Sequence, residues 1–206
     1  MPSGAYIIQA DVIDITSDAP QNGDIFFVDT NVWYWLTYSN ASFTAKPYQL
    51  NGYPNYISST LANGATLCYS DLLLPELAHI IENNECGIFN RLNSTNFKSK
   101  DLRRNHPSER IAIASKVRLA WEQIQRDAQP LELVLDISIS DRALDRFATE
   151  MVDGYDLFIL EIMANEGITK VITDDSDYAT VAGIQVFTVN LKVLADARTQ
   201  NKLVIR

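Results

Sequence analysis

Acidic residues follow two apolar segments that lie far apart in the sequence. Asp29 ends an apolar run that covers residues 25–28, and three acids lie within residues 174–177, after a second short strand-like stretch at 168–173. Both runs are typical of short buried strands. If the strands are parallel neighbours, their carboxyl ends bring these acids together at the edge where open α/β sheets bind ligands. Clustered carboxylates repel one another, and a hard divalent cation such as Mg²⁺ or Mn²⁺ relieves that repulsion.

Strand-like and helix-like segments alternate along the chain, which predicts an α/β fold with a mostly parallel sheet. The expected strands are residues 25–28, 133–137, 168–173 and 184–189, and the extended stretch 6–15 is expected to be an added edge strand. The expected helices are residues 32–36, 70–85, 107–130, 141–151 and 156–167. The first helix would be capped by Thr30 or Asn31 and the fourth by Ser140, while Pro107 suits a first helical position. Residues 39–56 and 83–106 are polar and are expected to be long connections.

The length of 206 residues and the hydrophobic content of 47% fit one domain with a full core. The first basic residue is Lys46, so the start of the chain lacks the charged region of a signal peptide, and no apolar run has transmembrane length. We therefore expect a cytoplasmic protein without a membrane partner. Cys68 and Cys86 lack the spacing of metal ligands and favour two buried thiols, with a single disulfide left open.

The net charge of −9 is unfavourable for binding nucleic acid, but the charge is unevenly distributed. Residues 1–90 contain nine acids and one base, whereas residues 98–118 contain seven bases and two acids. A solvated helix face and a surface that follows phosphates explain such a run about equally well. The bases considered for RNA binding are Lys98, Lys100, Arg103, Arg104 and Arg110.

Four short motifs together resemble the PIN-domain ribonucleases. They are Phe-Val-Asp-Thr-Asn at 27–31, Glu76 within Leu-Pro-Glu-Leu, the segment from Asp156 to Gly167, and Thr-Asp-Asp-Ser-Asp-Tyr at 173–178. The motifs occur in the order that the family uses, and they lie within residues 25–190. The resemblance implies a three-layer α/β/α sandwich around a mostly parallel sheet. It also implies a metal site formed by Asp29, Glu76, Asp156 and Asp175, with Asp177 as an auxiliary acid and Asn31 and Thr173 as polar supports.

The chain is longer than the compact PIN toxins of bacterial toxin–antitoxin pairs. We expect one PIN-like domain over residues 1–206, with a core at about 25–190, an extension at 1–24, and insertions at 39–69 and 83–106. These departures weaken the toxin assignment more than the nuclease assignment. A toxin would imply an antitoxin protein as a partner and a homodimer.

The expected reaction is cleavage of an RNA phosphodiester bond by water, with one or two Mg²⁺ or Mn²⁺ ions at the acids. Two ions would activate the water and stabilise the leaving 3′ oxygen, which yields a 5′-phosphate and a 3′-hydroxyl. Asp29 would be the central ligand and Asn31 would orient either Asp29 or the scissile phosphate. The choice between Asp153 and Asp156 as the acid that faces the site stays open.

The sequence is compatible with two other functions. One is a non-catalytic or regulatory PIN fold that binds RNA or protein, since each acid by itself could cap a helix or oppose a helix dipole. The other is a phosphotransfer enzyme, which would require a nucleophilic Asp-x-Asp motif after the first strand. Asn31 occupies the second acidic position of that motif. The sequence therefore favours the endoribonuclease.

Overall fold

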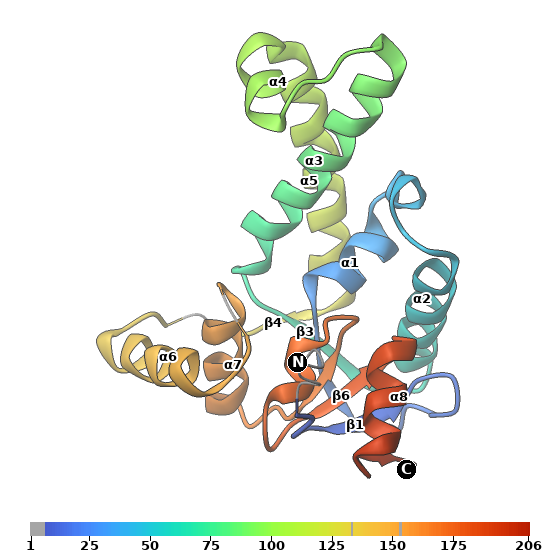
Figure 1. The fold of residues 1–206 in the computed structure, drawn as a ribbon, viewed down its shortest axis with the longest axis vertical. Coiled ribbons are helices and arrows are strands. Elements are labelled where there is room, and N and C mark those ends of the chain that lie inside the picture. Colours follow the sequence, from blue (N-terminus) through green and yellow to red (C-terminus); the bar gives the residue numbers. More distant parts are fainter. Residues whose placement is uncertain (1–6, 133, 153) are drawn as a thin grey trace, which may run out of the picture.

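The computed structural model describes residues 7–132, 134–152 and 154–206. Over these residues, seven strands form one sheet with the order β4-β3-β2-β5-β6-β1-β7, and every neighbouring pair is parallel. The strands are β1 (Asp11–Asp14), β2 (Ile25–Val28), β3 (Thr66–Tyr69), β4 (Gln129–Pro130), β5 (Lys170–Ile172), β6 (Gln185–Thr188) and β7 (Leu203–Val204). The predicted three-layer α/β/α fold around a parallel sheet is confirmed (Figure 1).

Helices connect the strands and form the outer layers. The helices are α1 (Thr30–Thr37), α2 (Pro47–Ala62), α3 (Leu73–Asn93), α4 (Ser99–Asn105), α5 (Pro107–Asp127), α6 (Ile137–Thr149), α7 (Asp156–Asn165) and α8 (Leu191–Thr199), with short 3₁₀ turns η1 (Ala41–Phe43) and η2 (Asp177–Thr180). Pro107 is the first residue of α5, as its fixed φ favours. Gly167 follows α7 with a φ of +67°, a conformation that glycine adopts without steric cost.

The central strands are buried on both faces, which explains their continuous apolar sequences. Phe26 and Phe27 of β2 are fully buried, and the ring of Phe26 lies edge-on to that of Phe187 at 4.9 Å. Val28 pairs with Ile172 in the register between β2 and β5. The residues that follow these two strands therefore start at the same level of the sheet.

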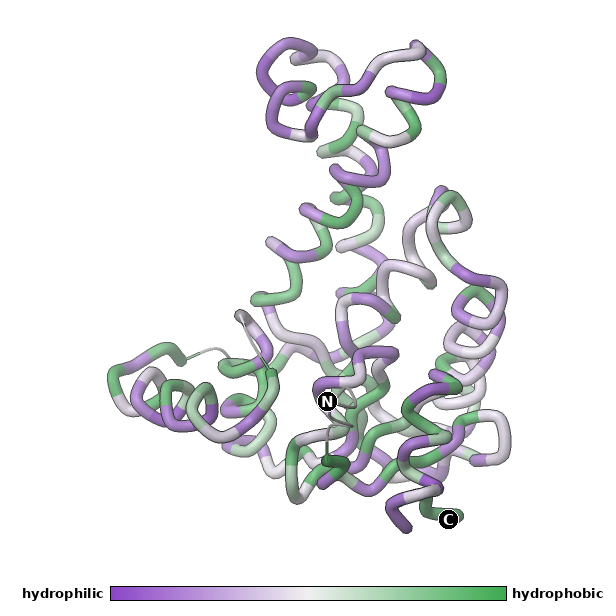
Figure 2. Tube along the Cα trace, in the orientation of Figure 1, coloured by the Kyte–Doolittle hydropathy of each residue, from purple (hydrophilic) through white to green (hydrophobic). Residues whose placement is uncertain are grey.

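Helices α3 and α5 form an arm that projects from the sheet, with α4 at its far tip (Figure 1). Glu82 is buried within this arm and accepts hydrogen bonds from Arg103 and Arg110. Lys116 forms an ion pair with Glu85 of α3. Hydrophilic residues predominate around α4 (Figure 2). Ion pairs between α3 and the bases of α4 and α5 therefore help to hold the arm together.

The predicted strand at 133–137 is wrong where the structure describes it. Leu133 lies outside the described residues, residues 134–136 are not in a strand, and Ile137 begins α6. The carboxylate of Asp136 accepts a hydrogen bond from the N–H of Ile139 and caps this helix in place of Ser140. The strand of this region is the two-residue β4. A good helix cap thus outweighed the β-branched composition.

The prediction of a long polar connection at 83–106 is also wrong. Helix α3 continues to Asn93 and α4 follows, because Glu82, Asn84 and Cys86 turn inward within the arm. The expected connection at 39–56 contains most of α2.

Two further predictions about single elements were wrong. The first helix is capped by the side chain of Asp29, not by Thr30 or Asn31. Strand β1 lies between β6 and β7 and is not an edge strand.

Cys68 and Cys86 are free thiols and both are buried, so the disulfide left open by the sequence is absent between them. Burial raises the pKa of the Cys68 thiol to about 11. Within the described part of the chain, no helix combines the length and the apolar character needed to cross a membrane.

Candidate active site

Asp29 lies at the carboxyl end of β2, where it ends the strand and caps α1. Its side chain is only 4% exposed. One oxygen, Oδ1, accepts a hydrogen bond of 2.6 Å from the N–H of Thr30. The other, Oδ2, accepts hydrogen bonds of 2.6 Å from Asn31 Nδ2 and from Thr173 Oγ1. These donors fix the orientation of the carboxylate at the edge of the sheet.

Three other acids surround Asp29. Burial raises the pKa of Asp29 well above its usual value, and the negative charges of Asp156, Glu76 and Asp175 raise it further. The hydrogen bond from Thr173 opposes this shift. The structure therefore brings the four acids of the expected site into one electrostatic cluster, from the ends of β2 and β5 and the starts of α3 and α7.

Helix starts position Glu76 and Asp156, because negative charge is favoured at the N-terminal end of a helix. Glu76 lies in the first turn of α3, and its Oε2 accepts a 2.6 Å hydrogen bond from Thr30 Oγ1. Asp156 is the first residue of α7, and its Oδ1 accepts a 2.8 Å hydrogen bond from the hydroxyl of Tyr178. Tyr178 is fully buried, and burial followed by the charge of Asp156 raises the pKa of its hydroxyl. Asp153 lies outside the described residues, so the choice between it and Asp156 stays a prediction.

The segment after β5 forms a tight turn that presents Asp175. The hydroxyl of Thr173 accepts a 2.8 Å hydrogen bond from the N–H of Asp175, and Oδ1 of Asp175 accepts a 2.9 Å bond from the N–H of Asp177. Asp177 begins η2 and is half-buried, and its Oδ1 lies 3.4 Å from Ser176 Oγ. Asp177 therefore helps to form the turn through its backbone.

Sequence reasoning did not single out the support that α2 gives to this turn. Asp174 accepts hydrogen bonds from Tyr53 at 2.7 Å, from Gln49 at 2.8 Å and from Tyr48 at 3.1 Å. Asn190 donates to the backbone oxygen of Asp174 at 2.8 Å. The sequence offered one signal for this support, the four-residue spacing of Gln49 and Tyr53. That spacing places two residues on the same face of a helix, but the sequence did not predict the helix α2 that contains them.

The basic residues considered for RNA binding lie on the arm, away from the acids. Arg103 and Arg110 form ion pairs with Glu82, whereas the other three are exposed on α4 or at its start: Lys98, Lys100 and Arg104. At a rise of 1.5 Å per residue, the tip of α3 at Asn93 lies about 25 Å along the helix axis from Glu76. Two of the five bases thus have a structural role, and the other three could reach only a distant part of an RNA.

The chemistry of the acidic cluster fits a hard divalent cation, since its donors are carboxylate and hydroxyl oxygens. Among the described residues, Asp29 and Glu76 have no ion pair with Lys or Arg. The carboxylates are instead turned toward their hydroxyl and amide donors, and no three described His, Cys, Asp or Glu side chains are arranged to hold an ion as they lie.

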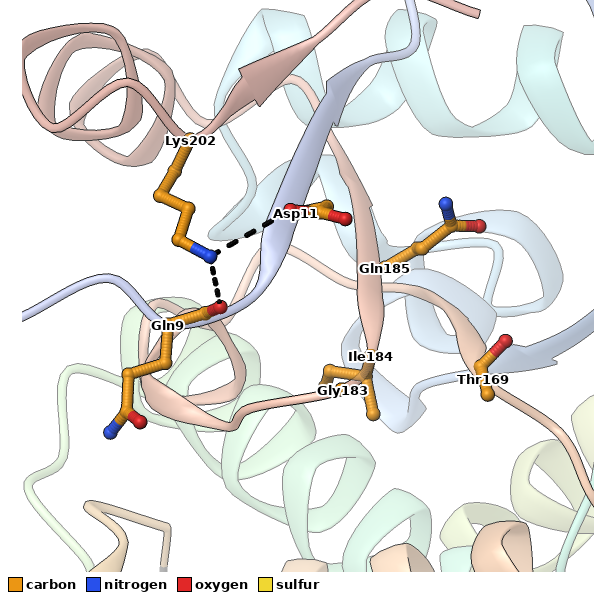
Figure 3. Close-up of a pocket in the computed structure, with 7 residues that line it drawn as sticks. All are labelled: Gln9, Asp11, Thr169, Gly183, Ile184, Gln185 and Lys202. Atoms are coloured by element: carbon orange, nitrogen blue, oxygen red, sulfur yellow. Dashed lines mark hydrogen bonds and ion pairs between the residues drawn. The ribbon is translucent and has the colours of Figure 1, made fainter.

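A hollow of about 350 Å³ at the opposite edge of the sheet has different chemistry (Figure 3). It lies at the amino ends of β1, β5 and β6, where Lys202 donates to the backbone oxygen of Gln9 at 2.8 Å and pairs with Asp11 at 3.8 Å. Asp11, the acid among the residues that line it, is thus paired with a lysine. This contrast supports the carboxyl edge as the functional one.

The family model described as the PIN domain matches residues 26–184 of the chain. The protein therefore belongs to the PIN domain family, whose members are typically metal-dependent nucleases that act on RNA or other nucleic acid. A search of curated proteins gives no match. The match begins within β2 and ends just before β6, so it contains all four acids of the cluster.

Proposed function

We propose that the protein is a divalent-metal-dependent endoribonuclease that cleaves RNA phosphodiester bonds by attack of water. The observation that carries this proposal is the cluster around Asp29, in which four carboxylates from separate elements share one edge of the sheet. An arrangement of this kind costs stability through repulsion, and a structural role would be served better by a neutral side chain.

Asp29, Glu76, Asp156 and Asp175 would hold Mg²⁺ or Mn²⁺, with Asp177 as an auxiliary acid. When bound, the metal would act as a Lewis acid that activates water and stabilises the leaving 3′ oxygen. Among the groups of the chain, Asn31 and Thr173 hold the Asp29 carboxylate in one orientation.

Hydroxyl groups orient two of the other acids. Thr30 donates to Glu76, and Tyr178 donates to Asp156. Such supporting hydrogen bonds commonly change metal affinity or activity by about 10- to 100-fold when they are removed.

The test is cleavage of a labelled structured RNA in the presence of Mg²⁺, Mn²⁺ or EDTA. We expect cleavage only with the metals, and we expect Asp29→Asn to lower the rate by at least about 100-fold while the protein stays folded. Asp11→Asn is the matched control, because Asp11 lies at the opposite edge of the sheet and should keep full activity. A fully active Asp29→Asn protein would refute the assignment.

The same assay separates the enzyme from a PIN fold that only binds RNA or protein. Metal binding without cleavage of several RNAs would support the binding module. We also propose, from the resemblance to PIN toxins, that the enzyme is the toxin of a toxin–antitoxin pair, with an antitoxin protein and a homodimer as its assemblies. A small DNA-binding protein encoded by the neighbouring reading frame would support the toxin, and sedimentation of the purified protein tests the dimer.

A further inference from the structure

A second hollow, of about 320 Å³, lies between α1, η1 and α3. We call it the α1–α3 hollow, and the residues that matter here are Tyr34, Phe43, Ile80, Asn84 and Gly87. Its lining is mainly aromatic and aliphatic, unlike that of the acidic cluster.

The α1–α3 hollow is lined by residues of α1 and α3, the two helices whose first turns lie at the acidic cluster. On α3, Glu76, Ile80 and Gly87 follow one another at helical spacing and share a face. At 1.5 Å per residue, Ile80 lies about 6 Å and Gly87 about 16 Å along the axis from Glu76. The bond from Thr30 Oγ1 to Glu76 joins the starts of the two helices. The hollow therefore begins about one helical turn beyond Glu76 on α3.

Aromatic walls suit a flat ring. Phe43 is half-buried and approaches α3 closely, because a Cβ at Gly87 would lie 3.2 Å from Cε1 of the Phe43 ring. The ring of Tyr34 stacks on that of Tyr38 with centroids 5.2 Å apart, which fixes its position. Base–aromatic stacking is the usual contact by which proteins hold unpaired bases.

A buried amide at the α1–α3 hollow lacks one hydrogen bond. Asn84 is 4% exposed, and its Nδ2 donates to the hydroxyls of Tyr34 and Thr44. Its Oδ1 has no partner among the described residues. Leaving a buried acceptor unpaired is unfavourable, so a ligand that offers an N–H group would be favoured here. The edge of a nucleobase carries such groups beside its flat face.

A positive charge lies at the rim of the α1–α3 hollow. The guanidinium of Arg91 lies 4.4 Å from the centroid of the Phe43 ring, one helical turn beyond Gly87. Arg91 is exposed and forms no ion pair with an acid in the described part of the chain. In a protein with a net charge of −9, such a cation is well placed to bind a phosphate.

We propose that the α1–α3 hollow binds one unpaired base of the RNA that is cut at the acidic cluster. The substrate is then single-stranded at that position, because a base inside a duplex cannot enter the hollow. This inference rests on the proposed endoribonuclease and adds to it a binding site for one base. A flat face, an N–H donor edge and a neighbouring phosphate occur together in a nucleotide, whereas an apolar protein side chain would leave Asn84 and Arg91 unused.

The test measures RNA binding by fluorescence anisotropy in an Asp29→Asn background, which prevents cleavage. The probe is a fluorescein-labelled single-stranded oligoadenosine, together with versions that carry one abasic ribose at each position in turn. Phe43→Leu should weaken binding by about 5- to 150-fold, the range that stacking on one base provides. Phe97→Leu is the matched control at the far end of the arm and should stay within twofold of the parent.

Coupling between protein and RNA identifies the base. An abasic ribose at one position should weaken binding to the parent and have no further effect on Phe43→Leu. Equal binding of Phe43→Leu and Phe97→Leu, or abasic losses that persist in full in Phe43→Leu, would overturn the proposal. Either result would favour a protein side chain as the occupant.

Two additional measurements keep the result interpretable. If Phe43→Leu lowers the melting temperature, the variant Arg91→Gln is used in its place. For Arg91→Gln, the slope of log affinity against log salt concentration should fall by about 0.7, the value for the loss of one phosphate contact. An unchanged slope would count against the proposal. Cleavage by the wild-type protein is measured in parallel. Absence of cleavage would refute the proposed function, whereas cleavage without the expected effects of Phe43→Leu would refute only the base-binding site.

Discussion

The hydroxyl of Tyr53 gives a quantitative test of how the site is supported. Tyr53 is fully buried, and its hydroxyl donates to Asp174 Oδ1 at 2.7 Å and accepts from the N–H of Val189 at 3.3 Å. The same hydroxyl lies 2.9 Å from Thr188 Oγ1. It therefore joins α2 to the ends of β5 and β6. Burial, followed by the charge of Asp174, raises the pKa of this hydroxyl, so it stays protonated and acts as a donor to the carboxylate.

Tyr53→Phe removes one hydrogen bond to a charged group and leaves the N–H of Val189 without its acceptor. A hydrogen bond to a charged group contributes about 1.5–3 kcal/mol. We therefore expect Tyr53→Phe to lower the free energy of unfolding by about 2–3 kcal/mol. For a chain of this size the melting temperature falls by about 2–4 °C per kcal/mol, which gives a decrease of about 4–12 °C. The rate constant of cleavage should also fall, because the adjoining Thr173 orients Asp29.

Urea and thermal unfolding measure the loss, with Tyr48→Phe as the matched control. Tyr48 donates to the same carboxylate at 3.1 Å but is only partly buried, so its hydroxyl should contribute about 1 kcal/mol or less. In the cleavage assay, Tyr53→Phe should lower kcat more than it raises KM, whereas Tyr48→Phe should change both little. Equal losses of stability in the two variants would refute the view that burial of the Tyr53 hydroxyl decides its contribution.

Two further predictions concern the charges of the arm. Hydrogen bonds from Arg103 lower the pKa of Glu82 in the folded protein, so its stabilising effect is complete above the unfolded value of 4.5 and is lost as the pH falls below it. Stability should therefore decline less steeply below pH 4.5 in Glu82→Gln than in the wild type when urea unfolding is compared at several pH values; equal slopes would contradict this assignment. Replacing both Lys98 and Lys100 by Ala should leave stability unchanged, and it should lower the salt slope of RNA binding by up to about 1.4 if each contacts one phosphate; an unaltered slope would restrict RNA binding to the sheet edge.

The central strands and the acids that follow them could be predicted from the sequence. Phe26–Val28 and Val171–Ile172 are apolar because both faces of the sheet are covered, and this produces a pattern that depends little on the rest of the fold. An acid after a buried strand can cap the next helix, as Asp29 does, but acids after two neighbouring parallel strands also meet at one edge of the sheet. Asp29 and Asp175 were therefore identifiable before the neighbouring elements were known.

The arm could not be predicted, because its polar residues serve contacts that depend on tertiary structure. Glu82 and Asn84 interrupt the apolar pattern of α3, yet both are buried by partners that come from α4, α5 and α1. A buried glutamate that pairs with two arginines has the same local sequence as an exposed one. The same holds for residues 134–137, whose apolar side chains are exposed: Val134 at 52%, Leu135 at 53% and Ile137 at 81%. Their composition predicted a strand, whereas Asp136 makes the local hydrogen bond that begins a helix.

The supports of the site were the least predictable feature, and the reason is chemical. Tyr53, Gln49 and Tyr178 act through hydroxyl and amide groups, which are common on any surface and which carry no charge pattern along the chain. Lys or Arg side chains that support an acid would have been easier to recognise in the sequence. The described ion pairs, however, join Lys and Arg to other acids, such as Asp24 and Glu82, and the donors to Asp29 are neutral groups. Neutral donors orient a carboxylate without cancelling its charge. The acids around Asp29 repel one another and raise its pKa, a repulsion that a divalent cation would relieve, while the buried hydrogen bonds that orient its carboxylate form only in the folded chain.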